Sequence, residues 1–177
     1  MIEKLRSNYK LSNVLVRIAL ALSYVLYSWQ TSLAVSSLML GQMIDMPVTG
    51  AYNLFIALMT SALLGVAIMF LVPLISRLFL HYSQFYSVPR AEYGLLTMLF
   101  VALYFAICGI LKLINLFTPI LLVWGEILFP ILVSLGCAIM FYRVTAKLYF
   151  NNQTKPYYFR SLLVTYVIMM VIAEVLL

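Results

Sequence analysis

The chain has 177 residues, of which 66% are hydrophobic and only 9% are charged, with a formal net charge of +6. A soluble domain carries about 25% charged residues, so this composition excludes an ordinary soluble protein and predicts one that crosses a membrane. The basic residues are scattered over short connections without a dense stripe, so we do not expect nucleic-acid binding.

The long apolar runs predict five membrane-spanning helices in one domain, residues 1–177. Lipid offers no hydrogen-bond partners, so each span must satisfy its own backbone, as a helix of about 20 residues does. A membrane β-barrel would instead alternate polar and apolar residues over about ten positions, and these runs do not. The predicted spans are 14–40, 53–80, 93–115, 119–146 and 158–177.

The first span begins with a feature that superficially resembles a signal peptide. Lys4, Arg6 and Lys10 precede an apolar run, but that run is far longer than the 7–15 residues of a signal-peptide core. We therefore predict a retained helix. Residues 1–10 alternate apolar and basic positions, which fits either a short interfacial helix or a disordered tail.

The second span carries small residues at a spacing of four, Ala57, Ser61 and Gly65. In lipid, helices associate through close approach at small residues. The ladder predicts a helix-packing face, either within the bundle or toward a membrane partner. Pro73, further along the same span, predicts a kink.

Polar residues inside the spans are the candidate site. Glu126 is the most costly, because an ionisable group in lipid is expensive, and Pro130 leaves the carbonyl of Glu126 without its helical donor. Lys112 on the preceding helix is expected to face it across a short hairpin. Gln30 in the first span and Glu174 near the end of the last complete the predicted intramembrane polar site.

The connection between the fourth and fifth spans is basic and aromatic. Arg143, Lys147, Lys155 and Arg160 are predicted to contact anionic lipid headgroups. Aromatic residues beside them predict a belt at the membrane interface, where amphipathic rings gather: Tyr142, Tyr149, Phe150, Tyr157, Tyr158 and Phe159.

The distribution of basic residues predicts the orientation. With five spans, ten of the eleven Lys and Arg residues fall on one side, and only Lys112 falls on the other. Because basic loops stay in the cytoplasm, the N-terminus is predicted to be cytoplasmic and the C-terminus exoplasmic, in the cell (plasma) membrane.

No catalytic or metal motif accompanies these features. The single histidine, His81, is predicted near the inner surface, whereas Cys108 lies toward the outer half, so the two do not form a peptidase pair. Cys108 and Cys137 fall within apolar spans and are expected to be core residues. We predict no metal site, no cofactor and no enzymatic activity.

The layout resembles the Yip1 family of five-helix membrane proteins. Pro89-Arg90-Ala91-Glu92-Tyr93 at the start of the third span and Tyr142-Arg143 at the end of the fourth carry the resemblance, together with the short polar loop before the last helix. It covers about residues 50–177, and it implies the five-helix fold and topology.

Two functions remain open from the sequence. The first is a non-enzymatic scaffold or accessory subunit that acts by helix packing with lipid, with a membrane-protein partner or with a second copy of itself. The alternative is a transporter or binding bundle for a small solute, ion or lipid, centred on Glu126, Lys112 and Gln30.

Overall fold

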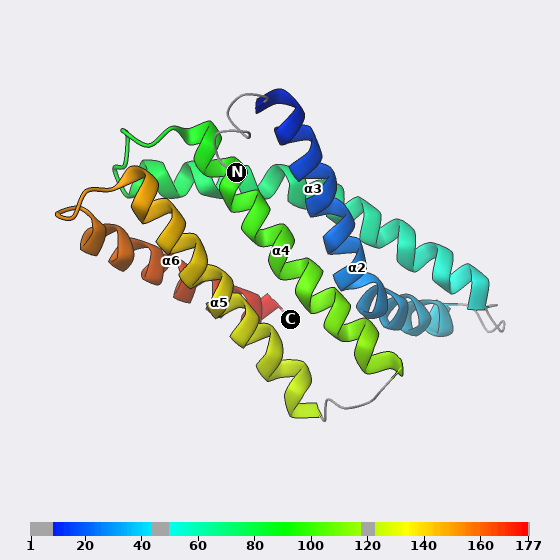
Figure 1. The fold of residues 1–177 in the computed structure, drawn as a ribbon. Helices are drawn as coiled ribbons and strands as arrows, with labels where there is room; N and C mark the ends of the chain where they lie inside the picture. Colours follow the sequence, from blue (N-terminus) through cyan, green and yellow to red (C-terminus); the bar gives the residue numbers. More distant parts are fainter. Residues whose placement is uncertain (1–8, 44–49, 118–122, 177) are drawn as a thin grey trace.

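Over the residues that the structure describes, the protein is an all-α bundle of five helices (Figure 1). The computed structural model describes the backbone of residues 9–43, 50–117 and 123–176, and the side chains of residues 10–29, 53–115 and 128–168. The helices are α2 (Tyr9–Met43), α3 (Gly50–Tyr82), α4 (Arg90–Phe117), α5 (Val123–Tyr149) and α6 (Lys155–Leu176).

Among the described residues, four helices are long and apolar enough to cross a membrane, within Lys10–Trp29, Asn53–Tyr82, Arg90–Asn115 and Leu128–Tyr149. The prediction of five helices is therefore confirmed, and four of them have the length and composition of membrane spans. The helices extend two to five residues beyond most predicted ends, because polar residues continue a helix after the apolar run stops. The predicted start at residue 119 and the predicted N-terminal segment 1–8 lie outside the described residues.

The first three helices pack closely at small residues. Gly65 of α3 is buried against α2, where a Cβ atom would lie 3.2 Å from the carbonyl oxygen of Ala21. Gly109 of α4 approaches α2 still more closely, since its Cβ would lie 2.8 Å from Leu26 Cγ and 3.1 Å from the Tyr27 nitrogen. α2 thus packs tightly on both α3 and α4, as lipid-embedded helices do at small residues.

Arg17 of α2 contacts α3 next to Pro73. Proline has no N–H, so the carbonyl of Met69, four residues earlier, lacks its helical donor. Arg17 Nη1 lies 3.4 Å from that carbonyl oxygen, and its Nε donates to Asn13 Oδ1 at 3.0 Å. The guanidinium also lies 5.7 Å from the centre of the Phe70 ring. One arginine therefore satisfies the group that the proline leaves open.

An aromatic cluster joins the other helices at one end of the bundle. Its buried members come from α3, α4, α5, α6 and their connections, and Tyr158 of α6 lies at its centre with 0% exposure. Tyr158 stacks on Phe150 at a centroid distance of 4.1 Å and contacts Phe79 at 6.3 Å. Between α3 and α4, Gln84 adopts a left-handed conformation with φ of 59°, and the next residue, Phe85, enters the cluster.

The cluster corrects the prediction of an interfacial aromatic belt. Tyr158 and Phe150 are core residues with 0% and 9% exposure, whereas Tyr157 and Phe159 are exposed. The ring of Tyr158 is buried because successive helix residues point about 100° apart, so one of three consecutive aromatics faces inward. Only the outward-facing members have the position expected of a belt.

Candidate functional site: an apolar cavity between four helices

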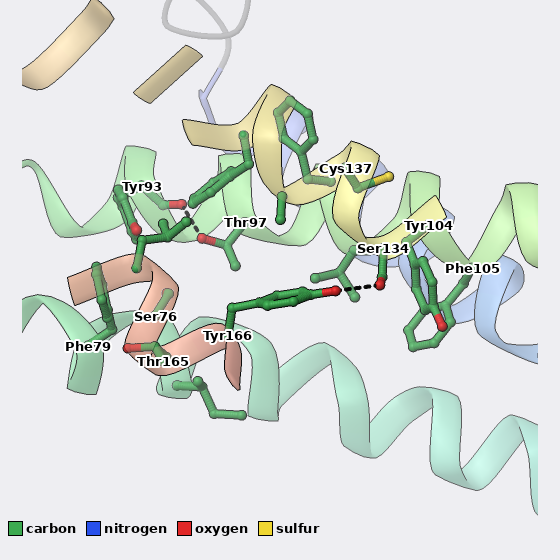
Figure 2. A pocket seen from close by; sticks show the side chains of 16 residues that line it. Ser76, Phe79, Tyr93, Thr97, Tyr104, Phe105, Ser134, Cys137, Thr165 and Tyr166 are labelled. Carbon is green, nitrogen blue, oxygen red and sulfur yellow. Dashed lines mark hydrogen bonds between the residues drawn. The ribbon is translucent and has the colours of Figure 1, made fainter. Parts of the chain in front are cut away.

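A cavity of about 500 Å³ lies between α3, α4, α5 and α6 (Figure 2). Its volume is within the range of small-ligand sites, about 300–1,000 Å³. Sixteen residues line it, and aromatic and aliphatic side chains predominate. They are Ile75, Ser76, Phe79, Tyr93, Thr97, Phe100, Val101, Tyr104, Phe105, Ser134, Cys137, Ala138, Phe141, Leu162, Thr165 and Tyr166.

None of these lining residues is charged, and several of their hydroxyl groups are already bonded. Ser76, Thr97 and Thr165 donate to carbonyl oxygens of their own helices at 2.8, 2.8 and 2.9 Å. Hydroxyls that bond back to the backbone are common in membrane helices. These donors are occupied, so the cavity wall has an apolar character despite its serines and threonines.

A hydrogen bond between α5 and α6 crosses one side of the cavity (Figure 2). Ser134 Oγ donates to the Ile131 carbonyl at 2.8 Å and lies 2.7 Å from the Tyr166 hydroxyl. Since the serine proton is used by Ile131, Tyr166 is the donor to Ser134. The bond fixes the position of α6 halfway along its length, where its backbone makes few contacts with α5.

The aromatic cluster closes one end of the cavity, where Phe79 of α3 meets Tyr158 of α6. Beyond this ring pair, α3 and α6 make little contact along the described residues, although α3 packs on α4, α4 on α5, and α5 on α6. The cavity is accordingly not fully enclosed.

A chain of buried hydroxyl groups holds α6 at the closed end. Thr145 Oγ1 donates to the Phe141 carbonyl at 2.7 Å, and the Tyr158 hydroxyl lies 2.6 Å from Thr145 Oγ1. Tyr158 must therefore donate to Thr145, which leaves its oxygen to accept from the Tyr93 hydroxyl at 3.2 Å. The chain runs in one direction from α4 through α6 to α5, and it rigidifies this end of the bundle.

Lys112, one of the predicted polar-site residues, extends toward α2. Its Nζ lies 4.0 Å from the centre of the Tyr27 ring and 3.3 Å from the Tyr27 carbonyl oxygen. An ammonium group over an aromatic face is stabilised by the ring quadrupole. The side chains of Glu126, Gln30 and Glu174 lie outside the described residues, so the expected pairing of Glu126 with Lys112 stays a prediction.

The other predicted site residues fall in two regions. Ala57 and Ser61 have 0% exposure, and with buried Gly65 they lie on α3. The predicted headgroup residues lie at the end of the bundle that holds the aromatic cluster. Arg143, Lys147 and Arg160 are exposed, and Lys155 is half-buried and donates to Asn152 Oδ1 at 2.9 Å. Neither region lines the cavity.

Sequence reasoning missed the cavity residues. Ser134, Tyr166 and Tyr104 lie in the middle of predicted spans, where a hydroxyl that can bond its own helix is a weak signal. The recurrence of hydroxyls and aromatics at helical spacing along α4 (Tyr93, Thr97, Phe100, Tyr104) was the available clue. No residue set with metal-binding composition, three or more His, Cys, Asp or Glu, occurs in the part of the chain that the structure describes.

No protein-family model, curated protein or solved structure matches this chain. The resemblance to the Yip1 family therefore finds no support beyond the shared number of helices. The function must be argued from the geometry alone.

Proposed function

We propose that this chain is a non-enzymatic, multi-pass membrane protein that holds an apolar ligand from the lipid phase, and that acts as an accessory or scaffold protein in the membrane. One observation carries the proposal: a cavity of about 500 Å³ between α3, α4, α5 and α6, lined by uncharged residues. A mainly apolar cavity of this size is the usual form of a small-ligand site.

The chemistry of the wall favours an apolar ligand over a polar one. A polar solute or an ion would lose its hydration shell without gaining charged partners, which is costly. An apolar molecule would leave the occupied hydroxyl groups undisturbed. The alternative is a solute or ion transporter centred on Glu126, Lys112 and Gln30, and none of these residues lines this cavity.

We further propose that the end of the bundle with the aromatic cluster faces the cytoplasm. The helix ends at Tyr82, Arg90, Tyr149 and Lys155 gather on one side of the molecule (Figure 1). Six basic residues lie at or near these ends: Arg77, Arg90, Arg143, Lys147, Lys155 and Arg160. This grouping agrees with the preference of Lys and Arg for the cytoplasmic side and with contacts to anionic headgroups in the plasma membrane.

The ligand is tested by mass spectrometry of protein extracted from its native membrane in detergent-free polymer discs. The wild type should retain an apolar molecule in a fixed ratio to protein. Ala138→Phe, which places a ring in the cavity, should lose it, whereas Met140→Phe on the exposed face of α5 should not. If both variants are folded and retain the apolar molecule equally, the cavity is not its binding site.

The orientation is tested by single cysteines in a background that lacks Cys108 and Cys137. A cysteine at Asn152, between α5 and α6, should react with an impermeant thiol reagent only after the membrane is opened. A cysteine at Thr49 should react in intact cells. Reaction of Asn152→Cys in intact cells would reverse the proposed orientation.

A further inference from the structure

We infer that the occupant of the cavity is one acyl chain of a membrane phospholipid, lying lengthwise along α4; this inference rests on the function proposed above. The length of the cavity matches an acyl chain. Lining residues on α4 run from Tyr93 to Phe105, and a rise of 1.5 Å per residue makes this separation about 18 Å. An extended chain covers about 1.2 Å per bond, so the cavity has the length of roughly 15 carbons.

The volume of the cavity fits a narrow, elongated ligand. About 500 Å³ spread over a length of about 18 Å gives a mean cross-section of about 28 Å². Non-bonded carbon atoms approach to about 4 Å, so a single hydrocarbon chain fits with room to contact both walls.

The wall of the cavity is uncharged, and the cavity is not fully enclosed. None of the lining residues is charged, so the cavity offers no cation for the carboxylate of a free fatty acid. A phospholipid chain brings only methylene groups into the cavity, while its headgroup stays at the membrane surface. Because α3 and α6 make little contact beyond Phe79 and Tyr158, we expect such a chain to enter between these two helices.

The ring-lined walls suit a flexible chain. Phe100, Tyr104 and Phe105 of α4 and Phe141 of α5 face the cavity from two sides, and their faces supply dispersion contacts along its length. A methylene group is stabilised when it leaves water for an apolar site, but a chain that leaves lipid gains no such term. We therefore expect the cavity to retain an acyl chain because its shape fits the walls, and not because the chain is hydrophobic. The fraction of protein that holds a chain should depend on the length and shape of that chain.

The test is photo-crosslinking in vesicles of phosphatidylcholine that contain a phosphatidylcholine with a diazirine near the end of one acyl chain. Adducts are mapped by peptide mass spectrometry. Val101 lines the cavity, whereas Leu103 on the same helix faces outward with 41% exposure. The ratio of adducts at Val101 to adducts at the exposed Leu103, which contacts bulk lipid, should fall about tenfold in Ala138→Phe, equivalent to about 1.4 kcal/mol. Met140→Phe should leave this ratio unchanged.

Thermal unfolding of each variant verifies that it is folded, and Thr165→Phe provides a second obstruction of the cavity from α6. An unchanged ratio of Val101 to Leu103 adducts in folded Ala138→Phe would overturn the acyl-chain inference. If mass spectrometry still finds another apolar molecule lost by Ala138→Phe, the proposed function survives and only the ligand class is wrong. If no molecule is retained and the adduct ratio does not change, both proposals fail.

Discussion

The two parts of this bundle are held together in different ways. α2, α3 and α4 meet at small residues, where Gly65 and Gly109 let backbones approach within ordinary van der Waals limits only because they lack a Cβ. α5 and α6 are joined by large aromatic rings around Tyr158 and, further along, by the hydrogen bond between Ser134 and Tyr166. Close packing at the glycines leaves no space between α2 and its neighbours, whereas the ring contacts leave a cavity beside the aromatic cluster. The difference indicates that the cavity exists because α6 is attached to the bundle through large side chains and not through close backbone packing.

The largest expected effect comes from crowding the close-packed part. Gly109→Leu would place side-chain atoms where Leu26 Cγ is 2.8 Å and the Tyr27 nitrogen 3.1 Å from a Cβ. Overpacking of this kind costs about 1–3 kcal/mol or more, and here the helix backbones must separate. We expect a large fall in thermal stability in detergent or loss of folded protein.

Gly136→Leu on α5 is the matched control, because a Cβ at Gly136 meets nothing within 4 Å. The same substitution should leave its thermal stability nearly unchanged. Similar losses for the two variants would show that the close contact between α2 and α4 does not carry the stability of the bundle.

The next effect concerns the aromatic end. Tyr158→Phe removes the hydroxyl that accepts from Tyr93 and donates to Thr145. Loss of a buried hydrogen-bond partner costs about 1–3 kcal/mol, so the unfolding temperature should fall. Tyr157→Phe alters an exposed residue and should change it little. If Tyr158→Phe is as stable as the wild type, the hydroxyl chain does not hold α6 in place.

The smallest effect concerns the link between Arg17 and Pro73. Arg17→Met leaves the Met69 carbonyl without the arginine donor, at a cost of about 1 kcal/mol, since the contact is long at 3.4 Å. Pro73→Ala restores a backbone N–H that this carbonyl can accept. Arg17→Met should therefore lower the free energy of unfolding less in the Pro73→Ala background than in the wild type. A double-mutant cycle of unfolding measures this difference. Additive effects would mean that Arg17 stabilises α2 in some other way.

The helices could be predicted from the sequence because lipid requires long apolar runs to be helical. The ladder of Ala57, Ser61 and Gly65 marked a small-residue face, and Pro73 marked an unsatisfied carbonyl at Met69. Neither pattern identifies the residue that it contacts on another helix. Only the structure shows that Gly65 packs against Ala21 and that the Met69 carbonyl meets Arg17. Sequence patterns specify which groups need a partner, and only the packing specifies which partner meets them.

The burial of Tyr158 and the cavity could not be predicted for a different reason. Aromatic residues at a membrane interface and in a core are of the same types and have similar neighbours in sequence. The buried Tyr158 therefore cannot be told from the exposed Tyr157 and Phe159 until the orientation of α6 is known. The cavity depends on side chains that do not fill the space between the helices, and the hydroxyl and aromatic residues along α4 do not by themselves reveal such a gap.

The central claim, that the bundle has a lipid-accessible cavity beside a tightly packed core, is tested most directly with the two native cysteines. Cys137 lines the cavity, whereas Cys108 is 2% exposed and does not. Membranes are treated with a small uncharged, lipid-soluble thiol reagent, and both peptides are quantified in one sample. Cys137 should react at least about tenfold faster than Cys108, equivalent to about 1.4 kcal/mol, and Ala138→Phe should remove the difference. Equal rates in the folded wild type would contradict the account.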